Sequence, residues 1–201
     1  SVLGSAPLTG YSGRSPLEAL SIGIQMEPDD MIFRCNVVTL TEEEPYAEKT
    51  ITDHSAGEIS TADAKVLMET IQKNFNTEEF QFYPGTSYRH IMIWKKGKLV
   101  SLEPPHDHLT QVIGDYLPKE PVLRDFMEKS FPLLNDHPLN VQRALDGKNK
   151  ANSLWYWGAG TKPSLTSFFR KTGLKGAMIS AVDLLKGIAV GADMKVCQVE
   201  G

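Results

Sequence analysis

The chain has 201 residues, of which 41% are hydrophobic and 23% are charged, a composition typical of a globular protein with one ample core or two modest domains. Its net charge of −4 at pH 7 argues against a nucleic-acid-binding or membrane-binding protein, because such surfaces need an extended basic field. Any basic cluster in this chain is therefore expected to be local and to bind a small anion.

Targeting and redox signals predict a cytoplasmic protein. The sequence shows no signal peptide and no apolar run near the ~18 residues that a membrane span requires. Cys35 and Cys197 lie in apolar, strand-like runs, as expected of buried free thiols in a reducing compartment. The loop-like start of the chain and its strand-like end predict a fragment of a larger protein.

The first elements in chain order are expected to be a helix, a strand and a second helix. Residues 15–24 begin with Ser, Pro and, three residues after the Ser, Glu, which is typical of a helix start. Residues 31–40 are β-branched and aromatic and predict a strand, and Ile51 lies in a possible short strand. Residues 60–75 predict a helix with an N-terminal cap. Its expected apolar positions are Ala64, Val66, Leu67, Ile71 and Phe75.

The middle of the chain predicts hairpins. Residues 79–85 and 87–102 alternate or are apolar, with Gly or Pro at their boundaries, so they are expected to be antiparallel neighbours. The Lys-Lys-Gly-Lys stretch at 95–98 predicts a further hairpin turn, and residues 104–109 predict a loop.

Two helices and an aromatic strand are expected next. Residues 121–136 are amphipathic, although Pro132 is expected to kink or shorten the helix. Residues 138–148 predict a short helix with Gly147 near its end, and residues 153–165 predict a strand that runs into a Gly-rich loop.

The last 30 or so residues have a different pattern of predicted secondary structure. Strand-like residues 177–181, helical residues 182–189 and strand-like residues 195–199 form a βαβ pattern, which predicts a parallel strand pair. The sequence therefore predicts an α+β domain with a mixed or antiparallel sheet and flanking helices, followed by a short α/β piece that begins near 170–173.

The motifs of several enzyme classes are missing. The sequence has no phosphate-binding Walker loop, no dinucleotide glycine fingerprint, no zinc-type Cys/His spacing and no nucleophile elbow. The His-Asp-His stretch at 106–108 offers metal-ligand side chains, but loop hydrogen bonding is the simpler interpretation of so short a cluster.

The placement of arginines is more informative. Arg34 lies inside an apolar strand, and Arg89 begins another. A buried guanidinium without a partner costs several kcal/mol, so each must face solvent, pair with a carboxylate or bind an anionic ligand. The planar guanidinium binds carboxylate and phosphate oxygens bidentately. With Asn36 and His90 beside them, these arginines are candidates for an anion site, and an exposed edge or an internal ion pair stays the alternative.

Two further stretches have structural explanations. Residues 53–60, "DHSAGEIS", precede the predicted helix, and capping explains them more simply than anion binding at the helix start. The aromatic side chains in "WYWGAG" at 155–160 are more often core or interface residues than ligand-stacking ones. Asn152 is expected to be a polar group at a strand end.

Several stretches, in this order, resemble one family. They are "YSGRSPLEALSIGI", "FRCNVVTL", "DHSAGEISTADA", "FYPGTSYRHIMIW", "PPHDHL", "NDHPLN", "ANSLWYWGAGTKPSL" and "GLKGAMISAVDLLKGIA". Together they resemble the archaeal-type 2,3-bisphosphoglycerate-independent phosphoglycerate mutases, and the likeness spans essentially the whole chain. Each motif alone is weak, but the ordered set is specific.

The resemblance implies a split protein of the alkaline phosphatase superfamily. Residues 1–26 would leave an α/β core, residues 27–170 would form an inserted substrate-binding domain, and residues 171–201 would be the βαβ piece that re-enters the core. The parent enzyme would interconvert 3-phosphoglycerate and 2-phosphoglycerate in glycolysis through a phosphoserine intermediate. Its serine nucleophile and two divalent ions, of the Mn or Mg type, would lie outside this chain, which alone would hold no metal and be inactive.

The resemblance also implies roles for residues of this chain. Arg34 and Arg89 would bind the oxyanion, and Arg14 would reach the site or brace the domain junction. The remaining expected substrate-binding residues are Asn36, His54, His90, His106 and Asp107. Glu58 is excluded, because many relatives are expected to have a histidine there.

Two alternatives stay open. One is an anion- or phosphosugar-binding module without catalysis, and the other is a different phosphotransferase of the superfamily, such as a homoserine kinase. The remainder of the core domain and the two phosphoglycerates are the expected partners, with no nucleic acid and no membrane among them.

Overall fold

The structure is a computed structural model that describes residues 23–24 and 26–161. These belong to two compact units, one formed by residues 34–92 and 100–157 and the other by the described residues up to Phe33 together with residues 93–99 and 158–161. The expected βαβ tail, Arg14 and Cys197 lie outside the described residues, as does most of the helix expected at 15–24.

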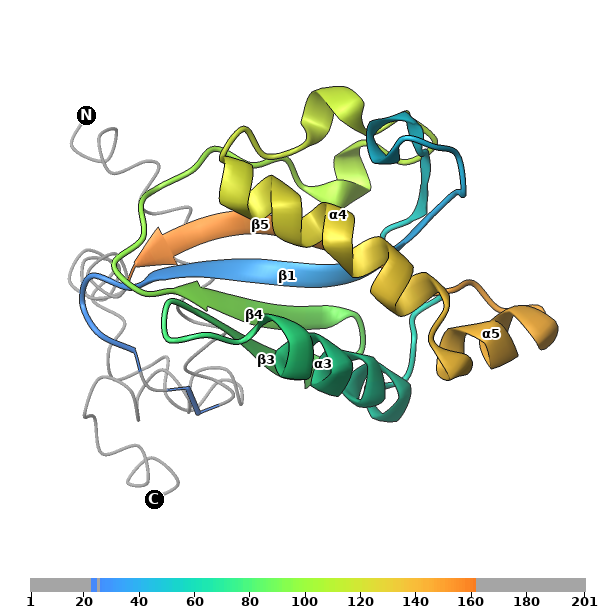
Figure 1. Cartoon of the computed structure of the whole chain (residues 1–201), viewed down its shortest axis with the longest axis horizontal. Coiled ribbons are helices and arrows are strands. Elements are labelled where there is room, and N and C mark those ends of the chain that lie inside the picture. Colours follow the sequence, from blue (N-terminus) through green and yellow to red (C-terminus); the bar gives the residue numbers. More distant parts are fainter. Residues whose placement is uncertain (1–22, 25, 162–201) are drawn as a thin grey trace, which may run out of the picture. The chain divides into compact units, whose positions relative to one another are not determined.

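A five-stranded sheet is the centre of the fold. The strands β1 (Met31–Leu40), β2 (Ile51–Asp53), β3 (Phe80–Thr86), β4 (Arg89–Trp94) and β5 (Ser153–Thr161) are hydrogen-bonded in the order β2-β1-β4-β3, and β5 also pairs with β1. Figure 1 shows β1 between β4 and β5. The strand bounds predicted for β1 are confirmed, and its apolar sequence is explained by this central position, since nearly all of its side chains are buried.

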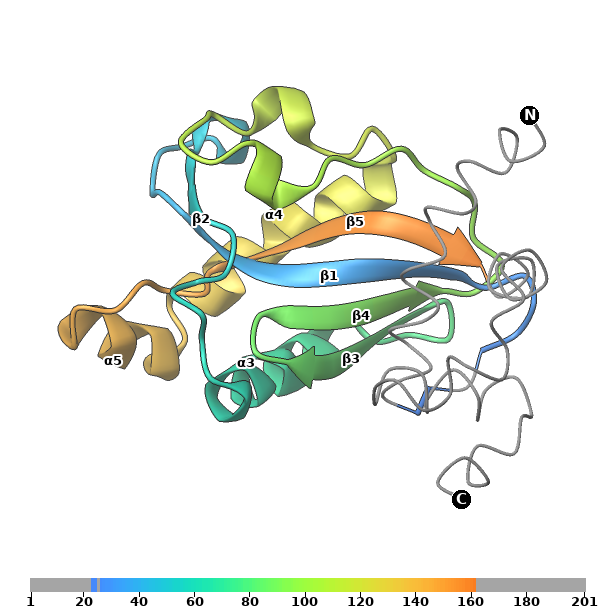
Figure 2. The same cartoon turned by 180° about the vertical axis from the view of Figure 1, so that it is seen from behind.

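Helices α3 (Thr61–Phe75) and α4 (Pro121–Asn135) cover one face of the sheet, as Figures 1 and 2 show. Helix α3 (Thr61–Phe75) begins at Ser60, whose side chain caps the helix by accepting a hydrogen bond from the Asp63 N–H. Its apolar side packs on β3. The sequence predicted Val66 on this apolar side, and this prediction is wrong, because Val66 is 41% exposed. Buried positions recur every three or four residues along α3, and Val66 falls off that stripe while Met68 joins it.

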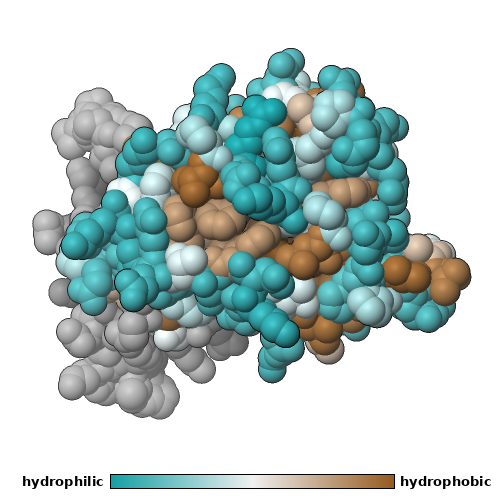
Figure 3. Space-filling model, in the orientation of Figure 1, coloured by the Kyte–Doolittle hydropathy of each residue, from teal (hydrophilic) through white to brown (hydrophobic). Residues whose placement is uncertain are grey.

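Helices α4 (Pro121–Asn135) and α5 (Pro138–Leu145) follow, and Gly147 lies just beyond α5 with a positive φ of 77°, as expected. Pro132 does not end α4, which continues to Asn135. The side chain of Pro132 is exposed, so the carbonyl that loses its helical partner lies on the solvent side of the helix and can bond to water. Figure 3 shows apolar surface on α5, where Val141 and Leu145 are exposed.

The hairpin predictions are confirmed in part. β3 and β4 are neighbours joined by a tight turn at Ser87 and Tyr88. A turn also follows β4, where the Gly97 N–H donates to the Trp94 carbonyl at 3.1 Å. The expected strand after this turn is not formed, because residues 99–102 join no ladder. The loop expected at 104–109 contains a short 3-10 helix, Pro105–Asp107.

In the smaller unit, an aromatic pair and an ion pair contribute to local packing. The rings of Phe33 and Trp94 stack with centroids 6.5 Å apart. The Lys95 ammonium lies 2.9 Å from the Asp30 carboxylate, which is almost fully buried. In the larger unit Cys35 is a buried free thiol, as expected, and burial raises its pKa.

Candidate functional site

Arg34 and Asn36 lie on one face of β1, because side chains two residues apart on a strand point the same way. Trp157 of β5 contacts both, so its side chain lies on that face too. Its neighbour Tyr156 points to the opposite face, where its ring lies 6.5 Å from that of Phe82, which in turn contacts Phe75 of α3. The two polar residues of β1 therefore lie on the face of the sheet opposite α3.

The indole of Trp157 is the meeting point of three polar side chains. The Arg34 guanidinium lies 4.2 Å from the centre of the indole ring, a cation–π contact. The indole N–H donates to the Asn36 Oδ1 at 3.0 Å. The His106 ring meets the indole edge to face with centroids 5.2 Å apart.

His106 reaches this place because the loop that carries it is tied to β5. The indole N–H of Trp155 donates a hydrogen bond to the Glu103 carbonyl at 2.8 Å. Glu103 also pairs through its carboxylate with His108 at 2.8 Å, and His108 stacks on Tyr116 at 3.7 Å. His108 is thus held by loop contacts, whereas the His106 and Asp107 side chains are 46% and 58% exposed.

His54 enters from the loop after β2, which Asp53 holds in shape. The Asp53 carboxylate accepts hydrogen bonds from the Ser55 N–H and hydroxyl, both at 2.9 Å, from the Gly57 N–H at 2.6 Å and from Asn149 at 2.7 Å. Burial alone would raise the pKa of Asp53, but these hydrogen bonds outweigh it and lower the pKa. The carboxylate is therefore charged at neutral pH and fixes the loop beside His54.

The position of His54 is set by contacts on several sides. Its carbonyl accepts a hydrogen bond from the Asn36 amide at 3.2 Å. Its ring lies 5.7 Å from the Tyr88 ring and 6.0 Å from the His106 ring. Its Nδ1 is buried and has no hydrogen-bond partner among the described residues, so this nitrogen is left with unused hydrogen-bonding capacity.

Arg89 stands at the start of β4 next to Tyr88. Its guanidinium donates to the Tyr88 hydroxyl at 3.1 Å and lies 5.0 Å from the centre of the Tyr88 ring. The hairpin tip is anchored by Ser87, whose hydroxyl donates to the Ile59 carbonyl at 2.6 Å and whose N–H donates to the Thr61 hydroxyl at 3.0 Å. Arg89 is exposed on an anchored hairpin.

His90 has a different environment. It is 1% exposed, and its Nδ1 accepts the Gly85 N–H at 2.8 Å. Burial lowers its pKa to about 3, so the imidazole is neutral near pH 7. Its Nε2 has no hydrogen-bond partner among the described residues. The hydrogen bond to Gly85 makes His90 part of the hairpin structure, and its expected role in substrate binding stays a prediction.

The structure thus links Arg34, Asn36, His54 and His106, joins Arg89 to them through Tyr88, and places the Asp107 carboxylate 3.7 Å from His106. We use the name arginine–histidine cluster for seven residues: Arg34, Asn36, His54, Tyr88, Arg89, His106 and Trp157. Two arginines lie on aromatic faces and two imidazoles lie at aromatic edges, so cations and hydrogen-bonding groups are held in place with little conformational freedom. Such a set can bind a carboxylate or phosphate together with neighbouring hydroxyls.

Sequence reasoning missed Tyr88 and Trp157 as members of the cluster. The "WYWGAG" aromatics were expected to be core or interface residues; Trp155 and Tyr156 are buried, whereas Trp157 is half-buried and contacts Arg34. A usable signal was the alternation of polar residues at 34 and 36 within β1, since such a strand needs a partner that covers its polar face.

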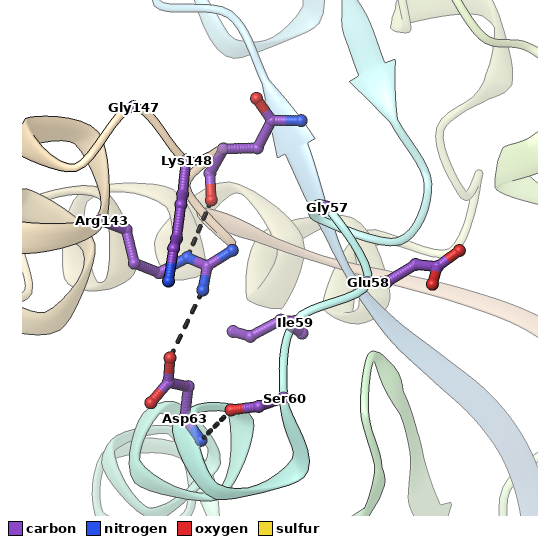
Figure 4. Close-up of a pocket in the computed structure, with 9 residues that line it drawn as sticks. Gly57, Glu58, Ile59, Ser60, Asp63, Arg143, Gly147 and Lys148 are labelled. Atoms are coloured by element: carbon purple, nitrogen blue, oxygen red, sulfur yellow. Dashed lines mark hydrogen bonds and ion pairs between the residues drawn. The ribbon is translucent and has the colours of Figure 1, made fainter.

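A separate pocket of about 470 Å³ lies between the start of α3 and the turn after α5 (Figure 4). Arg143 lines it, but its guanidinium already donates to the Asn149 and Ala56 carbonyls at 2.9 and 3.0 Å and pairs with Asp63 at 3.4 Å. Figure 4 shows the Glu58 side chain directed away from Arg143. The pocket wall is thus held by internal pairing, in line with the capping interpretation of residues 53–60.

The described residues form neither a group of metal ligands nor a membrane-spanning helix. Among residues 23–24 and 26–161, no three His, Cys, Asp or Glu side chains are grouped so that they could hold a metal ion. Within the same ranges no helix is long and apolar enough to cross a bilayer.

Comparison with known proteins gives a consistent result. The family model for 2,3-bisphosphoglycerate-independent phosphoglycerate mutase matches residues 1–140. A probable mutase of this name from Geobacter sulfurreducens is 46% identical over 205 residues, which cover 100% of this chain and 51% of the relative. The Methanosarcina barkeri mutase is also 46% identical and is covered over 50% of its length.

One solved structure shows the same fold. The cofactor-independent phosphoglycerate mutase from Thermoplasma acidophilum matches with a TM-score of 0.62 and 26% identity, over 94% of this chain and 52% of that one. The chain therefore spans about half the length of the relatives that it matches.

Proposed function

Because the chain belongs to the 2,3-bisphosphoglycerate-independent phosphoglycerate mutase family, we propose that it is the substrate-binding part of a cytoplasmic enzyme that interconverts 3-phosphoglycerate and 2-phosphoglycerate in glycolysis. The observation that carries the proposal is the convergence of Arg34, Asn36, His54 and His106 around Trp157 and Tyr88. These residues come from five separate stretches of the chain, and Arg34, Asn36, His54 and His106 were all expected from the sequence to bind substrate.

The chemistry of the substrate fits these side chains. Both phosphoglycerates carry a carboxylate, and the intermediate glycerate adds two hydroxyls that must be held while the phosphoryl group is on the enzyme. A guanidinium can donate two parallel hydrogen bonds to the carboxylate, and the imidazoles of His54 and His106 can donate to or accept from the hydroxyls. Holding the glycerate in place keeps the reacting groups together, which lowers the entropic part of the barrier.

The rest of the enzyme is part of the same proposal. Residues 1–26 leave an alkaline-phosphatase-like core, residues 27–170 form the inserted domain, and residues 171–201 return to the core. The serine nucleophile and two divalent ions of the Mn or Mg type belong to the core. In this proposal the described residues bind and orient the substrate and exclude water from it.

The test uses the full-length enzyme with Arg34→Gln, which keeps a polar side chain and removes the charge. We expect kcat/KM for 3-phosphoglycerate to fall by about 10²-fold or more, because an oxyanion loses a charged bidentate donor. Arg124→Gln is the matched control, since Arg124 is an exposed arginine of α4 that pairs with Glu128 at 3.1 Å.

Unchanged kcat/KM in Arg34→Gln would contradict the assignment of the site. An assay of the full-length protein with ATP and homoserine tests the kinase alternative, and turnover there without mutase activity would replace the proposed reaction. The 201-residue chain alone is expected to show no mutase activity.

A further inference from the structure

We infer that Trp157 is the positioning residue of the substrate site: its indole holds Arg34, Asn36 and His106 in the arrangement that binds the anion. The inference rests on the function proposed above and assigns a role to a residue that does not itself need to donate to the substrate.

Trp157 uses different parts of its ring for different partners. The face of the indole receives the Arg34 guanidinium at 4.2 Å, and the N–H donates to the Asn36 Oδ1 at 3.0 Å. The His106 ring makes an edge contact at 5.2 Å. Loss of this one side chain therefore removes support from three polar residues at once.

The contact with Arg34 matters most, because an arginine side chain is long and rich in rotamers. Immobilising such a side chain when a ligand binds costs free energy, which is lost from the affinity. A guanidinium that is already held against an aromatic ring has lost part of this freedom before the ligand binds, and its N–H donors remain in the plane around its edge. Trp157 thereby makes Arg34 a preorganised oxyanion donor.

The link to Asn36 extends the effect to His54. The Asn36 amide group accepts from Trp157 through Oδ1 and donates through Nδ2 to the His54 carbonyl at 3.2 Å. Trp157 therefore fixes the orientation of the amide, and the amide joins β1 to the loop that carries His54. Trp157→Phe would keep an aromatic ring and lose this link, whereas Trp157→Leu would lose both.

Kinetics of the full-length enzyme separate positioning from a structural role. For Trp157→Leu we expect KM for 3-phosphoglycerate to rise about tenfold with a smaller change in kcat, since binding is weakened in ground and transition states alike. Trp157→Phe is expected to fall between Leu and the wild type. Trp94→Phe, a buried tryptophan outside the cluster, serves as the control. Equal KM values in Trp157→Leu and the wild type would overturn the inference.

A spectroscopic test does not depend on turnover or on a stable Trp157→Leu variant. The full-length protein is labelled with 5-fluorotryptophan, and the fluorine resonance of Trp157 is assigned from its loss in Trp157→Phe. We expect this resonance to shift in Arg34→Gln and on addition of 3-phosphoglycerate, while the resonances of Trp94 and Trp155 stay in place.

The outcomes distinguish the two claims. A Trp157 resonance that ignores Arg34→Gln would overturn the positioning role even if mutase activity is found. A resonance that responds to Arg34→Gln, in a protein that neither binds nor converts 3-phosphoglycerate, would support the positioning role and remove the proposed function instead.

Discussion

Two polar regions of this molecule show opposite ways of using buried hydrogen-bonding groups. The first, which we call the asparagine network, consists of Asn135, Asn140 and Asn152, where the ends of α4, α5 and β5 meet β1. The Asn152 side chain accepts from the Leu40 N–H at 2.8 Å and donates to the Leu40 carbonyl and to Asn135 at 3.1 and 3.0 Å. Asn140 likewise donates to the Leu134 and Ala151 carbonyls at 2.8 and 2.9 Å.

The arginine–histidine cluster is built differently. Its cations lie on aromatic rings, one imidazole nitrogen of His54 has no partner among the described residues, and Arg89 and His106 are largely open to solvent. A network whose amides are fully used contributes to stability, whereas a cluster backed by aromatic rings keeps donors for a ligand. Under the proposed function, this difference separates polar residues that hold the fold from those that bind substrate.

The largest expected effect is in the asparagine network. Asn152→Ala leaves both backbone groups of Leu40 without partners in a buried place, so the free energy of unfolding should fall by roughly 2–5 kcal/mol. Urea denaturation measures this fall in the free energy of unfolding. Asn74→Ala, on the exposed surface of α3, is the control and should stay within about 0.5 kcal/mol of the wild type. If Asn152→Ala changed the free energy of unfolding only slightly, the asparagine network would not be the stabilising region that the comparison assumes.

The next effect depends on pH and concerns His90. Its pKa is about 3 in the folded protein and 6.5 as the ordinary value, so between these limits the unfolded chain binds a proton that the folded protein does not. The stability contribution is complete above pH 6.5 and is lost as the pH falls, by about 2 kcal/mol from pH 7 to pH 5. His90→Asn, which keeps an acceptor for the Gly85 N–H, should flatten this part of the stability curve.

Denaturation series at pH 7 and pH 5 measure the difference, with His106→Gln as the matched exposed histidine. If His90→Asn retains the full pH dependence of the wild type, His90 is not the buried neutral imidazole that the structure describes.

The smallest stability effect is expected in the cluster itself. Arg89→Gln loses one exposed hydrogen bond and one cation–π contact, so the free energy of unfolding should change by less than about 1 kcal/mol. Binding of 3-phosphoglycerate by the full-length enzyme should nevertheless weaken, which calorimetry can measure. A large loss of stability with unchanged binding would place Arg89 with the structural residues.

Much of the fold was predictable because local patterns decide it. The β-branched run of β1 and the Ser60 cap of α3 specify their elements without help from distant residues. Val66 and the missing strand at 99–102 were mispredicted because tertiary packing, which a linear pattern does not contain, selects which apolar residues find a neighbour.

The candidate site was predictable to a similar extent. The charge of Arg34 and Arg89 in apolar strands marked them as unusual, and the structure links both to aromatic rings. His90 was expected to bind substrate together with Arg89, and only the structure shows that His90 is buried while Arg89 is exposed, since neighbours on a strand face opposite ways. Trp157 could not be told from Trp155 or Tyr156 without knowing which face of β5 meets Arg34.

The three aromatic residues in a row on β5 have a consequence for how this strand can change over generations. Trp155 ties down the loop of Glu103, Tyr156 fills the core, and Trp157 supports Arg34. A substitution affects one of these contacts. A single-residue insertion or deletion before Trp155 turns every ring to the opposite face and so disrupts all three contacts. We expect the length of this strand to be inherited more strictly than the identity of any one of its side chains.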